Sequence, residues 1–141
     1  AGLKCEPKKV LYGGPMMGTS VPSLEAPVMK NTNAVLAFDA KDAEDPVPSS
    51  CIRCGRCVAH CPFSLMPAAI ESAYNNKAPE TLTALKVNLC MECGCCSFSC
   101  PARRPLVQVN KLAKAMLNQY NAEQKAAAEK KAAKEKEKEA V

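Results

Sequence analysis

One cysteine pattern, which occurs twice, constrains this chain more than any other feature. The pattern C-x2-C-x2-C-x3-C-P begins at Cys51 and again at Cys90, with a glycine after the second cysteine in each copy. The chain has 141 residues, 4% aromatic residues and no tryptophan. A small chain without a large aromatic core usually needs bound metal, disulfides or a partner to stay folded. The repeated pattern indicates that bound metal organises this region.

The spacing of these cysteines is typical of [4Fe-4S] clusters. Three closely spaced thiolates bind three corners of a cuboidal cluster, and the glycine lets the backbone approach it. In two-cluster proteins the fourth cysteine of each motif ligates the other cluster. The sequence therefore predicts one cluster on Cys51, Cys54, Cys57 and Cys100, and a second on Cys61, Cys90, Cys93 and Cys96. Since neither cluster has an open ligand position, we expect one-electron transfer and no self-contained catalytic site.

Zinc and air-oxidised disulfides are alternative uses of the same cysteines. Structural zinc prefers two paired C-x2-C knuckles with four ligands in total. Two copies of a four-cysteine motif in register favour iron and sulfide instead. A structural metal-binding module without redox activity, whose C-terminal tail recruits partners, is the alternative from another functional class.

Some candidate residues lie outside or beside the repeated pattern. We expect Cys95 to be a small apolar filler near a cluster, because a ligand role would break the spacing, and Cys5 to be a free thiol. His60, the only histidine, is either a polar surface residue or a group that raises a cluster potential when protonated. The aromatic residues of the motif region are expected to shield the clusters from water: Phe63 and Phe98.

The residues before the motifs predict a short β-rich segment at 1–45. Strands are expected at Val10–Tyr12 and Ala34–Phe38. The sequence GGPMMG at 13–18 predicts a structural turn with two core methionines. It lacks the lysine and hydroxyl residue of a phosphate-binding loop. The acidic, proline-containing residues 39–50 predict a linker.

The middle of the chain, residues 46–120, predicts a helical domain around the cysteines. Apolar spacing favours helices at 65–74, from Pro79 to Leu89, and at 106–120. Residues 121–141 are nearly all Ala, Glu and Lys. They favour helix but have no apolar stripe to bury, so we expect a solvated or disordered charged tail, or an interaction arm. The fold class predicted is therefore α+β.

The charge is concentrated in the middle segment. Residues 46–120 hold eight basic and three acidic residues. This excess favours an acidic electron-transfer partner, although ordinary surface charge would give the same count. Possible docking residues are Arg53, Arg56, Arg103, Arg104, Lys111 and Lys114. Nucleic acid is not indicated, because no basic block is interleaved with aromatic residues. No apolar run long enough to span a membrane occurs, and the N-terminus does not resemble a secretory signal.

Beside the cysteine motifs, three further segments carry a family resemblance. These are residues 13–18, residues 27–33 and, after the second motif, residues 105–108. Over about residues 10–118 the chain resembles the C-terminal portion of the RnfC family, the C subunits of Rnf electron transport complexes. The pairing of GGPMMG with two cluster motifs is specific to this family and its relatives.

The resemblance implies a β-grasp-like (SLBB) segment before a two-cluster ferredoxin-like domain. It also implies a membrane complex that passes electrons between ferredoxin and NAD, coupled to sodium or proton movement. The partners would be other subunits of that complex, with the chain peripheral on the cytoplasmic face of the membrane. FMN and NAD(H) would bind in a family domain upstream, so we expect this chain to be a fragment that relays electrons from a flavin. Cobalamin-reducing flavoproteins of bacterial microcompartments are similar in this region and provide an alternative.

Overall fold

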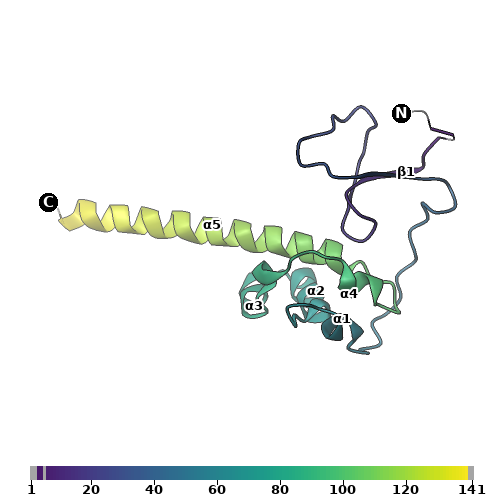
Figure 1. Ribbon diagram of the computed structural model, residues 1–141. Coiled ribbons are helices and arrows are strands. Elements are labelled where there is room, and N and C mark those ends of the chain that lie inside the picture. The colour runs from purple at the N-terminus through teal and green to yellow at the C-terminus, as the bar shows by residue number, and fades with distance from the viewer. Residues whose placement is uncertain (1–2, 5, 140–141) are drawn as a thin grey trace.

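The computed structural model describes residues 3–4 and 6–139, with side chains as far as residue 130. Cys5, predicted to be a free thiol, lies outside the described residues. The chain forms a small sheet followed by helices (Figure 1). The elements in chain order are β1 Lys9–Tyr12, β2 Thr19–Ser20, β3 Val35–Phe38, α1 Arg56–Ala59, α2 Pro67–Asn75, α3 Pro79–Ala84, the 3-10 helix η1 Val87–Leu89, α4 Cys95–Phe98 and α5 Leu106–Glu139.

The N-terminal segment is β-rich, as predicted, and forms a three-stranded antiparallel sheet in the order β2-β1-β3. Val10 pairs with Ala37, and both Val10 and Leu11 on the central strand are buried. Strand β2 was not predicted, because Thr19–Ser20 has no apolar alternation and follows a glycine-rich turn. It nevertheless pairs with β1 and gives the sheet its third strand.

Helix α2 begins at Pro67, the predicted first-turn position. The predicted helix from Pro79 to Leu89 is wrong in its second half. Helix α3 ends at Ala84, and Lys86 adopts a left-handed backbone with φ 53°. The chain then turns into η1, which directs Val87 into the core and leaves Leu89 exposed. Apolar spacing alone could not reveal this break, since nothing in the residue type of Lys86 requires it.

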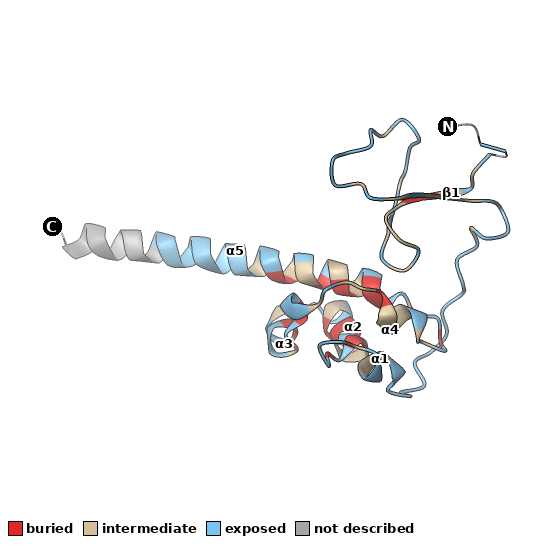
Figure 2. Ribbon diagram, viewed as in Figure 1, coloured by how far each residue is buried: buried red, intermediate tan, exposed pale blue. Residues whose placement is uncertain are grey.

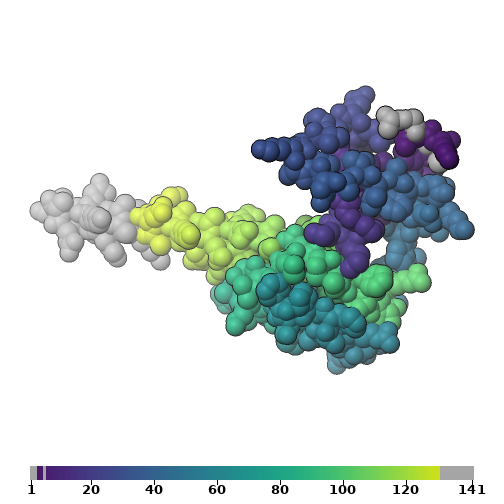
Figure 3. All heavy atoms as spheres, in the orientation of Figure 1, coloured from purple at the N-terminus to yellow at the C-terminus, as the bar shows by residue number. Residues whose placement is uncertain are grey.

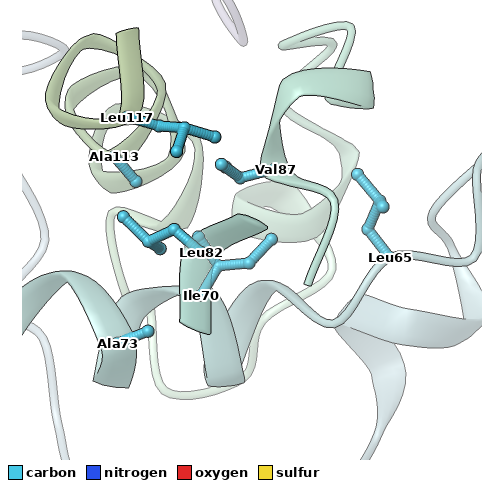
Figure 4. Close-up of a cluster of buried hydrophobic side chains, with 7 residues drawn as sticks. All are labelled: Leu65, Ile70, Ala73, Leu82, Val87, Ala113 and Leu117. Atoms are coloured by element: carbon cyan, nitrogen blue, oxygen red, sulfur yellow. The ribbon is translucent and has the colours of Figure 1, made fainter. Parts of the chain in front are cut away.

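One apolar core joins the helices (Figure 4). Its members come from the turn before α2, from α2, α3 and η1, and from the first turns of α5: Leu65, Ile70, Ala73, Leu82, Val87, Ala113 and Leu117. Figure 2 shows that buried positions on α5 stop well before its end. Residues 121–130 are all exposed, as the lack of apolar residues larger than alanine predicts. Helix α5 crosses residue 120 without a break, so the tail continues it as helix to Glu139.

The sheet contacts the helical part through the loop at 13–18 (Figures 1 and 3). The Lys111 ammonium on α5 donates a hydrogen bond to the Met17 carbonyl oxygen at 2.8 Å. Gly18 N–H donates to the Gly14 carbonyl at 2.7 Å and closes the loop. The predicted turn is therefore present, but its methionines are not core residues. Met17 is half exposed because the loop tip lies on the surface of the helical part, and Met16 is partly buried against Gly94.

The close approach of Met16 explains why a glycine is needed at 94. An alanine Cβ there would lie 2.9 Å from the carbonyl carbon of Met16, whereas one at Gly55 would meet nothing within 4 Å. Both glycines have a positive φ, 75° at Gly55 and 83° at Gly94. An alanine at Gly55 would therefore test backbone strain alone, whereas an alanine at Gly94 would test backbone strain together with the packing of Met16.

We predict that Gly55→Ala lowers stability by about 1–2 kcal/mol, the cost of a left-handed non-glycine residue. Gly94→Ala should cost more, because the Met16 backbone must also move. The measurement is the thermal unfolding midpoint of both variants, together with the rate of proteolysis within residues 13–18. Equal midpoints and equal cleavage rates for the two variants would contradict the close packing of this loop.

Candidate metal centres

The cysteines of the two motifs line two separate cavities. Site A is partly open to solvent, and its walls include Cys51, Cys54, Cys57 and Cys100. The walls of site B include Cys61, Cys90, Cys93 and Cys96. The fourth cysteine of each motif therefore lies in the cavity built by the other motif. Each cavity contains the four cysteines of one predicted set, and site B contains Cys95 as well.

The two motifs adopt the same backbone conformation, so the fourth cysteine of each motif is directed in the same way, toward the cavity of the other motif. Short helices α1 and α4 follow the glycine of each motif, and helices α2 and α5 begin at equivalent positions after the fourth cysteine. Three pairs of equivalent residues have a positive φ: Arg53 and Glu92, Gly55 and Gly94, Ser64 and Arg103. The left-handed residues curl each loop around its cavity.

The donor set in both sites fits an iron–sulfur cluster. All four motif side chains in each site are thiols, which favour soft metals and iron–sulfur clusters. In the described part of the chain, no three His, Cys, Asp or Glu side chains converge tightly enough to hold a single ion, and the sulfurs line a cavity wall instead. Burial raises the pKa of Cys96 to about 11. A bound metal would supply the positive charge that deprotonates this thiol.

Site A and site B differ in exposure. Cys51 and Cys54 of site A are exposed, whereas Cys96 of site B is buried. Two N–H groups contact sulfurs in site B: Leu65 N–H donates to Cys61 Sγ at 3.3 Å, and the Asn110 amide lies 3.6 Å from Cys90 Sγ.

An ion pair between buried Glu71 and partly exposed Arg104 lies beside site A. The Arg104 guanidinium binds the Glu71 carboxylate through two contacts of 2.8 Å, and it also donates to the Ser49 carbonyl at 3.2 Å. The hydrogen bond that Arg104 donates to Glu71 raises the pKa of Arg104. Arg104 therefore fastens α2 to the turn before α5, which is a structural role that sequence reasoning missed.

Three of the six predicted docking residues form hydrogen bonds or ion pairs with other residues of the chain. These are Arg104, Lys111 on the Met17 carbonyl, and Lys114, which contacts Glu92 at 2.7 Å and the Cys90 carbonyl at 3.0 Å. Arg53, Arg56 and Arg103 are exposed, and they join none of the ion pairs formed by described residues.

Other candidate residues lie at the edges of the sites. Cys95 is partly buried and lines site B, where a hydrogen bond with Cys93 raises its pKa. His60 is exposed, and its Nδ1 lies 2.9 Å from the Arg56 carbonyl oxygen. The prediction that Phe63 and Phe98 shield the sites is wrong, since they are 51% and 80% exposed. Phe98 lies two residues after buried Cys96 on the short helix α4, and therefore faces outward.

Sequence reasoning also missed the two buried polar residues of the described chain, Glu71 and Asn110. Each is the fifth residue of its helix, α2 or α5. An alignment of the two motifs that continued beyond their prolines would have placed Glu71 and Asn110 at equivalent positions. Although α5 is long, neither it nor any other described helix has the apolar stretch that crossing a bilayer requires.

The region of the two motifs matches a known sequence family. The family described as "4Fe-4S dicluster domain" matches residues 50–104, which include both motifs. The C subunit of a proton-translocating ferredoxin:NAD(+) oxidoreductase complex from Clostridium ljungdahlii is 44% identical over 70 residues, 50% of this chain and 15% of the relative. The C subunit of an ion-translocating oxidoreductase complex from Pseudomonas aeruginosa is 48% identical over 65 residues, 45% of this chain and 8% of the relative.

A third relative extends the similarity into the sheet. The C subunit of the ion-translocating oxidoreductase complex from Salmonella arizonae is 40% identical over 124 residues, which is 87% of this chain and 18% of the relative. The match to each of these three relatives thus spans less than a fifth of the relative's length.

The grouping of the cysteines generates a ligand prediction. Cys100→Ala should remove the same metal centre as Cys51→Ala, because both line site A, and each should lose about half of the bound iron. Cys90→Ala should remove the other centre. Cys95→Ala, which alters a thiol of site B at a variable position of the second motif, is the matched control and should retain both. Iron content and the electron paramagnetic resonance (EPR) spectrum of the reduced protein provide the measurements. A Cys100→Ala spectrum like that of Cys90→Ala would refute the exchange.

Proposed function

Since the chain is homologous to the C subunits of ion-translocating oxidoreductase complexes, we propose that it is an electron-transfer module with two [4Fe-4S] clusters. The observation that carries this proposal is that the eight motif cysteines line two cavities, four in each, and that both motifs contribute to each cavity. Such clusters supply reversible one-electron chemistry without a bound substrate.

The chain's own residues hold the two centres and fix their separation. Cys51, Cys54, Cys57 and Cys100 would ligate the first cluster, and Cys61, Cys90, Cys93 and Cys96 the second. Because each set combines cysteines of both motifs, metal binding would also hold the two motifs together and stabilise the fold of the helical part.

A thin apolar wall separates the sites and supports electron transfer between them. Leu106 lines site A, and the next residue, Val107, lines site B. Both are almost fully buried and pack with Cys96 of site B and with Cys57 and Cys100 of site A. Ligands of both sites thus contact one small cluster of side chains, which excludes water between them.

Within the complex, we propose that the module relays electrons between a flavin and the next carrier of a ferredoxin–NAD oxidoreductase. By the family resemblance, FMN and NAD(H) would bind upstream of the cysteine motifs. The sheet would then be part of an SLBB-like segment, and the module would be a peripheral part of the complex on the cytoplasmic face of the membrane.

The surface around site A suits an acidic electron-transfer partner. Arg53 and Arg56 belong to the loop that surrounds site A, and Arg103 follows its ligand Cys100. Glu71, which binds Arg104 in the wall of this site, is buried and its charge is neutralised by Arg104. Exposed Ile52 adds an apolar contact between two exposed ligands. The partner would therefore approach the more accessible of the two centres.

The first prediction of this proposal concerns cofactor content. Protein kept anaerobic should contain about eight iron and about eight acid-labile sulfide per chain, the content of two four-iron clusters. Its visible absorbance should bleach reversibly with dithionite. About two zinc ions per chain without sulfide would instead indicate a structural metal module.

The second prediction concerns the docking surface. The rate of electron transfer to an acidic ferredoxin should fall as salt is added, because screening weakens charge steering. The double variant Arg56→Gln/Arg103→Gln should be several-fold slower at low salt and less salt-sensitive. Lys125→Gln, an exposed cation far along α5, is the matched control. A wild-type rate that is constant across ionic strength would contradict an acidic partner.

A further inference from the structure

The two buried polar side chains occupy equivalent positions in the two motifs but have different partners. The Glu71 carboxylate on α2 is occupied by Arg104. Asn110 on α5 is only 1% exposed, and its amide nitrogen lies 3.6 Å from Cys90 Sγ. Its Oδ1 is a buried oxygen with no hydrogen-bond partner among the described residues. The polar contact recorded for this side chain is therefore with a ligand sulfur of site B.

An unpartnered buried oxygen lowers stability, and it needs a reason. A leucine of similar size would fill the same space on α5 without that cost. Asparagine differs from leucine at this position by its N–H group, which points to a sulfur in a cavity that Asn110 itself lines. Leu65, Pro67 and Val107 make the surrounding wall apolar, and an apolar environment strengthens a hydrogen bond to a charged acceptor.

Site A has no equivalent contact among the described residues. The side-chain and backbone N–H groups that approach a cysteine sulfur in this part of the chain, those of Leu65 and Asn110, both belong to site B. Lys114, which follows Asn110 by one turn of α5, is neutralised by Glu92. The asymmetry therefore lies in hydrogen bonding to sulfur rather than in net charge beside Cys90.

From this geometry we propose that Asn110 is a positioning residue that raises the reduction potential of the site B cluster by donating an N–H hydrogen bond to Cys90. Donation to a thiolate disperses negative charge and favours the more reduced, more negative state, and hydrogen bonds to sulfur are among the determinants of cluster potential. The inference rests on the proposed function. It adds that one side chain contributes to an electronic difference between the two clusters.

The test measures the midpoint potential of each cluster separately, by redox titration followed by EPR, in the full chain with its clusters. Asn110→Leu and Asn110→Val remove the N–H donor with two different side-chain shapes. Asn110→Gln retains an amide. Asn118→Leu, which makes the same change at an exposed position of α5, is the matched control.

We expect the potential of one cluster to shift to more negative values in Asn110→Leu and Asn110→Val, while the other cluster and the Asn118→Leu control stay unchanged. Asn110→Gln should shift less. Unchanged potentials in fully loaded variants would overturn the inference, as would loss of the site B cluster in both apolar variants, which would make Asn110 an assembly residue. Wild-type protein without iron and sulfide would instead reject the proposed function, so the two failures are distinguishable.

Discussion

The exchange of the fourth cysteine between the motifs is the constraint on which the rest of this structure depends. Cys61 belongs to the first motif but lies in site B. Cys100 belongs to the second motif but lies in site A. Helices α2 and α5 begin shortly after these two residues, so the exchange brings the helices against each other. The apolar core between them is small, with seven buried residues. Ligation that joins both motifs would compensate for that small core.

The same backbone pattern builds two sites with different surroundings. Site A faces solvent through Cys51 and Cys54, and its neighbouring arginines are exposed. Site B is covered by α5, and the loop at 13–18 packs on its Gly94. In the proposed electron-transfer role, site A would be the centre that a partner can approach. The strands contribute no cysteine to either site, and the loop at 13–18 between β1 and β2 contacts the Gly94 side of site B and Lys111.

The sequence was sufficient for features that depend on local spacing. The motif spacing predicted which cysteines share a cavity, and proline with apolar periodicity predicted the start of α2. It was insufficient where a residue's role depends on distant partners. Lys86 breaks a predicted helix because the chain must turn toward Cys90, and Met16 lies on Gly94 from far away in sequence. From the sequence, Arg104 was predicted to be a surface docking residue, whereas in the structure it binds Glu71.

The equivalent residues of the two motifs explain how the same backbone conformation can form two sites with different surroundings. Arg53 and Glu92 share a left-handed backbone, yet Arg53 is an exposed cation at site A, whereas Glu92 at site B is paired with Lys114. Arg103 and Ser64 form a similar pair beside Cys100 and Cys61. Backbone geometry, which the cysteine spacing and glycines require, is thus kept in both motifs, while side chains at matched positions set the charge. A cation-rich environment favours the more negative state of a nearby centre and attracts an acidic partner. Differences between the two sites therefore arise from side chains that the ligand motif leaves unconstrained.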